Sequence, residues 1–311
     1  MANGDATGFD ACVVGAGMAG LSAALLLGRA RRATLVADAG TGRNAAARAV
    51  HGVIGHDGTP PERLRALAGQ QVAGQADAFE IGLADGQCYR TRRVLLATGI
   101  ADELPPIDGL RPLWGRTVVH CPYCHGWELR DQPLAFLILR PADVFLGLKL
   151  THLSSDVVGL LNGTPDPPPA QQEMLREAGI TLRAEPIARL ADDGDRLRQV
   201  IFTDGTYLDR AGLFVHPPAR QAAPFAASLG CDMLPDGIVA VDDLGRTSVP
   251  GVYAAGDMGR RAAMPIPGQL VAVAAAAGTL AAVAADQELL LADTGAPLPW
   301  PASVGSDPES G

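Results

Sequence analysis

The fold is decided by residues 9–38, which read FDACVVGAGMAGLSAALLLGRARRATLVAD. An apolar run from Phe9 to Val14 is followed by glycines and then by a helical pattern from Ala19 to about Arg29. A second apolar run, from Ala33 to Ala37, ends at Asp38. This order is typical of a β-α-β unit of about 30 residues, so we expect two parallel strands joined by a helix.

The turn inside this unit carries the pattern G-x-G-x-x-G at Gly15, Gly17 and Gly20. Gly15 permits a tight turn, Gly17 lets a pyrophosphate approach the backbone, and Gly20 lets the helix pack closely on the strand. The helix N-terminus then faces the phosphates, and Asp38 can accept hydrogen bonds from ribose hydroxyls. The pattern favours a dinucleotide over a ligand-free glycine turn, but it does not separate NAD from FAD.

A second turn near the end of the chain favours FAD. Residues 252–257 read VYAAGD, a strand that runs into Gly256 and Asp257. This turn resembles the second FAD motif of flavoproteins with two dinucleotide sites, which implies that Asp257 contacts the ribityl or phosphate region; a helix cap is the alternative. A helix is predicted from about Gln269 to Leu291. We interpret its Ala-rich stretch, residues 270–285, as a buried helix, because a membrane span needs about 20 strongly apolar residues.

Length and composition favour two compact α/β units. The chain has 311 residues, which is too long for one ordinary core. The proline-rich stretch at residues 105–112 predicts a domain crossing, so we place an FAD-binding domain at residues 1–115 and 244–311 and an inserted domain at residues 116–243. The net charge of −9, without a basic stripe, makes nucleic acid and membrane surfaces poor partners. The N-terminus lacks the pattern of a signal peptide, so we expect a cytoplasmic protein.

The chemistry is predicted to lie in residues 120–128, which read HCPYCHGWE. Cys121 and Cys124 are separated by two residues and can close a disulfide within one turn. At a helix N-terminus the backbone dipole favours a thiolate. His125, beside Cys124, can accept or donate a proton near neutral pH, and His120 is a second candidate for proton transfer. We therefore predict a redox-active dithiol inside a dinucleotide-binding frame.

Other readings of this pair are weaker. A zinc knuckle normally needs a second C-x-x-C, which the chain lacks, and we predict no metal site. The match to C-x-x-C-H haem attachment requires export, and a glutaredoxin-type Cys-Pro-Tyr-Cys normally stands near the start of a small domain. An inert pair of buried thiols is the fourth alternative. The scattered Cys12, Cys88 and Cys231 are interpreted as small buried apolar residues.

The order of these motifs resembles that of the low-molecular-weight thioredoxin reductases. The resemblance covers residues 9 to 291 and includes Ala97, Thr98 and Gly99 at the end of a further predicted strand. Within that superfamily, residues 121–128 look most like the FAD-dependent dithiol oxidases of disulfide natural-product pathways, such as those for holomycin, gliotoxin and romidepsin. Reductases usually carry an aspartate directly after the second cysteine, where this chain has His125. Residues 42–44 and 51–58 also resemble the oxidase branch.

The resemblance implies a fold, a cofactor and an assembly. The fold would be two Rossmann-like, three-layer ββα domains of the dinucleotide-binding type, and the cofactor would be FAD. The chain would form a homodimer. The middle domain departs from the family, because after a strand at residues 134–139 the chain reads RPADVF, without a glycine turn. Pro141 lacks an amide donor, Asp143 puts negative charge where phosphates would lie, and Lys149 is the only Lys or Arg between residues 141 and 175. We therefore expect a degenerate middle domain and no NADPH as electron source.

The function implied is oxidation of a small-molecule dithiol to an intramolecular disulfide. By resemblance, Cys121 would face the substrate and Cys124 the flavin, with oxygen as the acceptor that gives hydrogen peroxide. His125 would accept the proton and be oriented by Glu128, while Gln269 and Leu270 would lie near the flavin pyrimidine edge. The pathway would be biosynthesis of, or self-protection against, a disulfide natural product. The alternatives are a disulfide reductase fed by NADPH or ferredoxin, and a non-catalytic flavin-binding protein, against which the intact cysteine pair argues.

Overall fold

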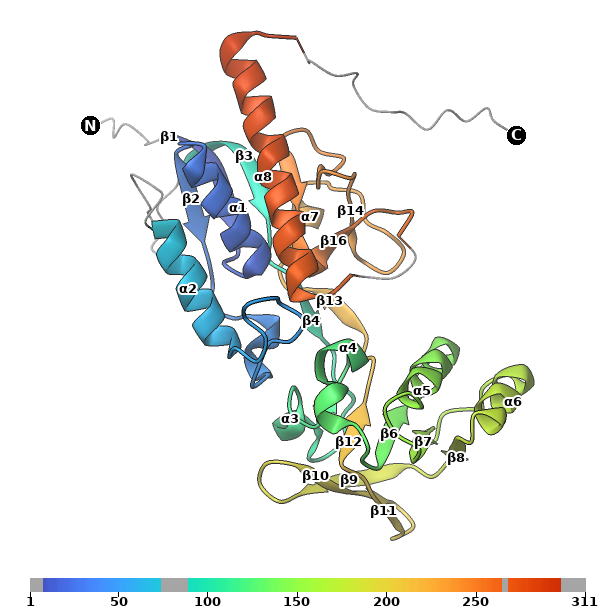
Figure 1. Ribbon diagram of the computed structural model, residues 1–311. Helices are drawn as coiled ribbons and strands as arrows, with labels where there is room; N and C mark the ends of the chain where they lie inside the picture. Colours follow the sequence, from blue (N-terminus) through green and yellow to red (C-terminus); the bar gives the residue numbers. More distant parts are fainter. Residues whose placement is uncertain (1–7, 74–88, 265–267, 298–311) are drawn as a thin grey trace, which may run out of the picture.

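The computed structural model describes residues 8–73, 89–264 and 268–297, and these form two lobes (Figure 1). Both ends of the chain build the first lobe, and the middle of the chain builds the second. Each lobe contains a parallel sheet with helices packed against it. The predicted fold class, two Rossmann-like α/β units, is confirmed.

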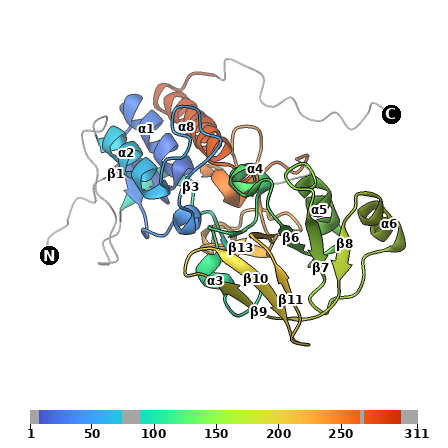
Figure 2. The same cartoon turned by 60° about the horizontal axis from the view of Figure 1, so that its bottom comes forward.

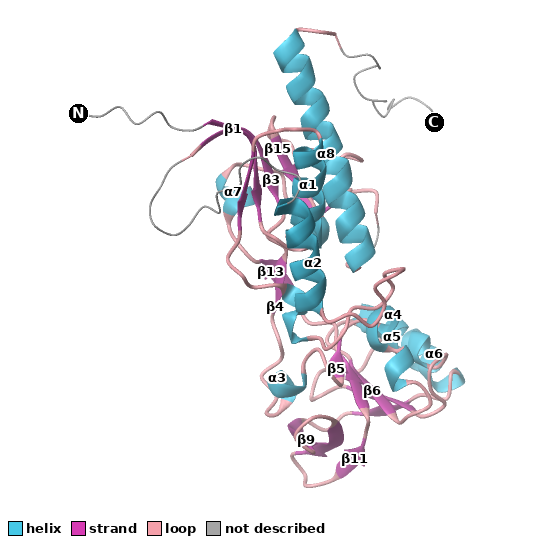
Figure 3. Ribbon diagram, turned by 60° about the vertical axis from the view of Figure 1, so that its left-hand side comes forward, coloured by secondary structure: helices cyan, strands magenta, loops and turns pink. Residues whose placement is uncertain are grey.

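The first lobe is built on a parallel sheet with the strand order β15-β3-β1-β2. Alternate residues of β1 (Phe9, Ala11 and Val13) are buried, as expected for a strand with one face in the core. Figure 3 shows the long helices side by side against this sheet. The elements are β1 (Gly8–Val14), α1 (Met18–Arg29), β2 (Thr34–Ala37), η1 (Arg43–Ala46), α2 (Pro61–Ala73), β3 (Arg90–Leu96), β15 (Val252–Ala254), η4 (Gly256–Met258) and α8 (Val271–Thr294).

Helix α8 packs along α1 through small residues. Gly278 lies so close that an added Cβ would overlap the carbonyl oxygen of Ala19. Within the described residues α8 is the one helix long and apolar enough to cross a membrane by length and hydropathy alone, although only a third of that window is buried. The predicted buried helix is therefore buried along one side, whereas Leu280, Val283 and Leu290 are exposed on the other.

We expect Gly278→Ala to lower the free energy of unfolding by about 1–3 kcal/mol, because α1 and α8 would have to separate to admit the methyl group. Gly69→Ala is the matched control, since an added Cβ at Gly69 in α2 meets nothing within 4 Å. There the lost backbone freedom of the unfolded chain should raise stability by about 0.5–1 kcal/mol. Urea unfolding followed by circular dichroism measures both, and equal stability of Gly278→Ala and wild type would contradict the close packing.

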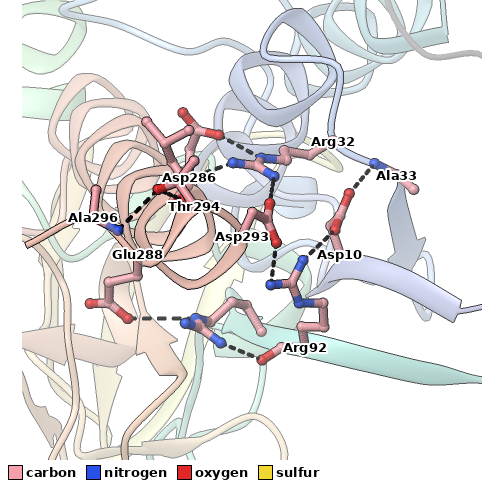
Figure 4. A network of polar contacts seen from close by, with 11 residues as sticks. Asp10, Arg32, Ala33, Arg92, Asp286, Glu288, Asp293, Thr294 and Ala296 are labelled. Carbon is pink, nitrogen blue, oxygen red and sulfur yellow. Dashed lines mark hydrogen bonds and ion pairs between the residues drawn. The ribbon is translucent and has the colours of Figure 1, made fainter.

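Ion pairs tie the C-terminal half of α8 to the sheet (Figure 4). Arg32 contacts Asp286 at 2.6 Å and Asp293 at 2.8 Å. Arg92 of β3 contacts Asp293 at 2.6 Å and Asp10 of β1 at 3.2 Å. Water and salt screen such partly exposed pairs, so each adds little on its own. Together they fix the helix whose first turn faces the cavity described below.

The second lobe is a three-layer arrangement around a parallel sheet with the order β5-β12-β6-β7-β8. Strand β6 is buried on both faces: Leu134 and Phe136 pack with the helices, whereas Ala135 and Leu137 pack with an antiparallel sheet. Figure 2 shows α5 and α6 on one side of the sheet and β9–β11 on the other. The elements are β5 (Val118–Val119), β6 (Leu134–Leu137), η3 (Pro141–Asp143), α5 (Val144–Leu150), β7 (Val157–Leu160), α6 (Pro169–Glu177), β8 (Thr181–Arg183), β9 (Ile187–Asp192), β10 (Leu197–Phe202), β11 (Tyr207–Asp209) and β12 (Gly212–Phe214).

The chain crosses between the lobes at the pair β4 (Ile100–Asp102) and β13 (Ala219–Gln221). The remaining elements are short. They are β14 (Val239–Ala240), which pairs with β16 (Gly259–Arg260), and the helices α3 (Leu110–Leu113), α4 (Pro122–His125), η2 (Trp127–Leu129) and α7 (Phe225–Ser228). The domain boundaries after residues 115 and 243 stay a prediction. Because residues 107–113 pack in the core of the second lobe and residues 226–239 in that of the first, we propose to move both crossings to the β4–β13 pair.

Candidate active site

A cavity of about 580 Å³ opens where the carboxyl ends of the first lobe's strands meet the second lobe. Its size is that of a small-molecule or cofactor site. Segments from both lobes line it, and they bring together nearly all the predicted cofactor residues. Those in the lining are Gly15, Gly17, Asp38, Ala97, Thr98, Gly99, Gly256, Asp257, Gln269 and Leu270.

The glycines of the first turn fit a bound dinucleotide, each for its own reason. Gly15 has a φ of 108°, and an added Cβ there would overlap the carbonyl oxygen of Ala97. Gly20 lies outside the lining, pressed against the Gly15 carbonyl oxygen, where no Cβ would fit. An added Cβ at Gly17 would meet nothing within 4 Å, so this glycine leaves open space at the N-terminus of α1. That space is where a pyrophosphate can approach the backbone.

Asp38 is held at the edge of the cavity by the turn itself. Its Oδ1 accepts a hydrogen bond from the amide of Ala16 at 2.8 Å, and its Oδ2 accepts one from the amide of Gly40 at 2.8 Å. Each carboxylate oxygen keeps a second lone pair. The side chain can therefore accept further hydrogen bonds from ribose hydroxyls, as predicted.

Arg43 is a residue of the cavity that was noticed only by resemblance, within residues 42–44, and for which no role was predicted. It begins η1 and donates two hydrogen bonds to Asp102, at 3.0 and 2.7 Å. It also donates to Asp257 at 2.9 Å and to Gln269 at 3.1 Å. Burial opposes its charge, but the two carboxylates outweigh burial and raise the pKa of Arg43. No motif signals this contact, because its partners lie 59, 214 and 226 residues away.

The cysteine pair starts a single helical turn, α4, with Cys121 as its N-cap and Pro122 at its first position. The Sγ atoms lie 2.6 Å apart, with Cys124 donating to Cys121. This hydrogen bond lowers the pKa of Cys121, because it stabilises the Cys121 thiolate, and raises that of Cys124, because Cys124 has to keep its proton to donate it. Cys124 lines the cavity, and Cys121 does not. Among the other cysteines, Cys231 is buried and Cys12 half-buried, while Cys88 lies outside the described residues.

Two histidines of the motif line the same cavity, and both favour the neutral form. Burial and the charge of Arg43 lower the pKa of His120 to about 4. Burial, followed by the nearby His51, also lowers the pKa of His125. Both ring nitrogens of the half-buried His125 are buried, and neither has a hydrogen-bond partner in the described structure. A neutral imidazole can accept a proton, so both residues suit the predicted role.

Glu128 does not orient His125 in the way the sequence suggested. Its Oε1 instead lies 3.7 Å from Nε2 of His51, a residue of a loop in the first lobe. The opposite nitrogen of His51, Nδ1, lies 3.3 Å from Asp57. His51 lines the cavity, and sequence reasoning assigned it no role. Within the described ranges, no three His, Cys, Asp or Glu side chains are placed to hold a metal ion.

The turn after β6 is filled by its own aspartate. Asp143, only 1% exposed, accepts hydrogen bonds from the amides of Leu139 at 3.0 Å and Arg140 at 2.9 Å. The Arg140 guanidinium donates to the same carboxylate at 3.2 Å. Although burial alone would raise the pKa of Asp143, the nearby His216 and the guanidinium of Arg140 bring it below its usual range. Two backbone donors of this turn are therefore already occupied by an internal anion.

A family model described as pyridine nucleotide-disulphide oxidoreductase matches residues 9–140 and 165–278. The chain belongs to this family. It is an oxidoreductase of the thioredoxin reductase-like group, as its motif order predicted, and its cofactor is FAD. The cavity residues above fit that cofactor.

Relatives of this oxidoreductase are similar along most of its length. The crystal structure of HlmI superposes with a TM-score of 0.85 and 35% identity, covering 93% of this chain and 94% of HlmI. A putative thioredoxin reductase, TrxB from Bacillus anthracis, gives 0.84 and 32%, covering 92% and 99%. The thioredoxin reductase tcpT of Claviceps purpurea is 31% identical, covering 80% of this chain and 86% of tcpT.

Proposed function

We propose that this oxidoreductase oxidises a small-molecule dithiol to an intramolecular disulfide through Cys121 and Cys124, with oxygen as the final acceptor and hydrogen peroxide as the second product. It would act as a thiol:oxygen oxidoreductase in biosynthesis of, or self-protection against, a disulfide natural product. The observation that carries the proposal is the state of the turn after β6, where Asp143 fills the site that a nicotinamide nucleotide would need.

Asp143 opposes NADPH in two ways. Its carboxylate takes the amides of Leu139 and Arg140, which are donors that a phosphate would otherwise use. Its negative charge, buried at 1% exposure, would also repel a phosphate in the same place. Electrons therefore have to enter at the other redox centre, which is the cysteine pair.

The proposed exchange at the pair balances in electrons and protons. A substrate thiolate attacks Sγ of Cys121, the Cys121–Cys124 disulfide breaks, and Cys124 leaves as a thiolate. The second substrate thiolate attacks the substrate sulfur of this mixed disulfide, which closes the substrate disulfide and releases the Cys121 thiolate. The substrate loses two electrons and two protons, and the pair gains the electrons. Bound FAD supplies the two-electron acceptor that passes them from the pair to oxygen.

The chain's own residues suit this direction. Cys124 contacts the cofactor cavity and Cys121 lies outside its lining, which supports the predicted inner and outer roles. The lowered pKa of Cys121 makes it the better leaving group of the pair when substrate closes its disulfide. His120 and His125, both neutral, would accept the substrate's protons. FAD would be held by the glycine turn, Asp38, Asp257 and the Arg43 cluster.

The relatives support thiol–disulfide chemistry, because the family model is that of a disulphide oxidoreductase and tcpT is named a thioredoxin reductase. The natural-product setting rests on the resemblance of residues 121–128 to the dithiol oxidases of disulfide pathways. A homodimer is also proposed, since α8 exposes Leu280, Val283 and Leu290 along one side. A cytoplasmic location remains part of the same proposal.

An anaerobic titration tests the direction of electron flow. We expect a small dithiol, dithiothreitol, to bleach the flavin absorbance of the FAD-loaded protein promptly after mixing. NADPH should leave the absorbance unchanged, because Asp143 blocks its phosphates. Readmitting air should restore the absorbance with formation of hydrogen peroxide. Prompt bleaching by NADPH would overturn the proposal. Bleaching by reduced ferredoxin, coupled to reduction of thioredoxin disulfide, would favour the reductase instead.

A further inference from the structure

His51 comes from a loop that reaches across the two lobes. The loop is closed at its base by a bridge between Val50 and Thr59, with the Val50 amide donating to the Thr59 carbonyl at 2.8 Å. Inside it, the Asp57 carboxylate accepts a hydrogen bond from the Gly52 amide at 2.7 Å and lies 3.3 Å from Nδ1 of His51. These contacts fix the imidazole at the cavity, where its side chain is 19% exposed.

The other edge of His51 faces the cysteine helix. Its Nε2 lies 3.7 Å from Oε1 of Glu128, and its ring meets that of His125 edge to face, with centroids 6.4 Å apart and an interplanar angle of 76°. The titratable groups that face His51 are thus Asp57 from its own loop, Glu128 from η2 and His125 from α4. Two carboxylates lie against opposite ring nitrogens, at 3.3 and 3.7 Å, so each nitrogen of His51 faces an acceptor oxygen when it carries hydrogen.

His125 needs such a neighbour. Both of its ring nitrogens are buried without a hydrogen-bond partner in the described part of the chain. An imidazolium in that position would be neither solvated nor paired, so a proton taken from a thiol has to move on quickly. The exposed carboxylates beyond His51 offer the exit, since the side chains of Asp57 and Glu128 are 65% and 43% exposed.

We propose that His51, held between Asp57 and Glu128, relays the substrate's protons from His125 to solvent. In each transfer the S–H bond of a substrate thiol breaks and an N–H bond forms on His125. The His125 ring, whose nitrogens have no partner, turns toward the facing edge of His51 and passes the proton to it. From the imidazolium of His51 the proton goes to water beside the two carboxylates. The relay rests on the proposed exchange at Cys121 and Cys124, but not on the identity of the final electron acceptor. His51 acts through His125, so it is a positioning and relay residue.

The test compares His51→Gln with His56→Gln in the FAD-loaded, full-length protein. His56 is an exposed histidine of the same loop, which makes it the matched control. After anaerobic mixing with dithiothreitol, we expect His51→Gln to slow reduction of the pair by about 10²-fold and to change its pH dependence. His56→Gln should behave as wild type. FAD content and thermal midpoint should be unchanged in both.

Chemical rescue separates a relay from a merely structural role. Added imidazole should restore part of the lost rate in His51→Ala, and Asp57→Asn should show a smaller loss of the same kind. Equal rates and pH profiles for His51→Gln and wild type would overturn the proposal. A slowed His51→Ala that retains FAD and is not rescued would also overturn it. Trapping the thiols with iodoacetamide follows the exchange without the flavin, so the relay is tested even if NADPH proves to be the electron donor.

Discussion

Cys124→Ser is expected to abolish dithiol oxidation, with a loss of about 10⁴-fold or more, because the pair acts as one unit and no other cysteine of the described ranges lines the cavity. Cys121 remains in this variant as the N-cap of α4 and can still meet a substrate disulfide. We expect it to trap a linear disulfide as a stable mixed disulfide, since the partner sulfur that would resolve it is absent and the leaving half carries no second thiol. Mass spectrometry of the intact protein after incubation with oxidised 2-mercaptoethanol measures the adduct.

Cys121→Ser should lose the same activity but form no such adduct readily. The remaining thiol, Cys124, faces the cofactor cavity and not the substrate side in the proposed arrangement. An adduct on Cys124 that forms as fast as the one on Cys121 would contradict the assignment of inner and outer cysteines. Peroxide formation at the wild-type rate in either variant would remove the pair from the reaction altogether.

The hydrogen bond from Cys124 also sets the pH range in which Cys121 reacts as a thiolate. It lowers the pKa of Cys121, so the Cys121 thiolate should persist at a lower pH than that of an ordinary thiol, whose pKa is about 8.5. In Cys124→Ser the serine hydroxyl can still donate, so alkylation of Cys121 should keep most of this shift. Cys124→Ala removes the donor and should move the alkylation profile to higher pH.

Local patterns predicted the elements that hold FAD. The pattern G-x-G-x-x-G fixes one turn between one strand and one helix, so its spacing alone predicted α1 and β2 to within a residue. Helix α2 begins at Pro61, where the missing amide donor of proline would be unpaired in any case. The cysteine motif was equally local. Its spacing predicted that the pair would start a turn of helix, which is α4.

Contacts between distant segments were not predictable in the same way. The loop at residues 51–58 was noticed only by resemblance, and its sequence does not predict the contact between His51 and Glu128. The contact depends on how the two lobes are joined. The same limit applies to α8, whose composition predicted burial, although only packing against α1 decides which side is buried.

Arg43→Met is expected to cost the protein its FAD and much of its stability. Arg43 neutralises Asp102 and Asp257, whose side chains are only 7% and 21% exposed. Removing one partner of such a buried cluster leaves carboxylates without a counter-ion, which typically costs about 3–5 kcal/mol. The change also releases Gln269, which loses its hydrogen bond from the guanidinium. The ratio of flavin to protein absorbance and urea unfolding measure the two effects.

Arg48→Met separates this effect from the general loss of an arginine. Arg48 lies just after η1 and pairs with Asp195, but the two side chains are 62% and 41% exposed. The loss of an exposed pair should change the free energy of unfolding by no more than about 1 kcal/mol and leave FAD bound. Arg43→Lys should fall between the two, because an ammonium keeps the charge but cannot make the paired bonds to Asp102. If Arg43→Met retained FAD and had the same free energy of unfolding as Arg48→Met, Arg43 would be an incidental neighbour of the cavity. The turns that carry Asp257 and Gln269 would then have to set the positions of these two residues.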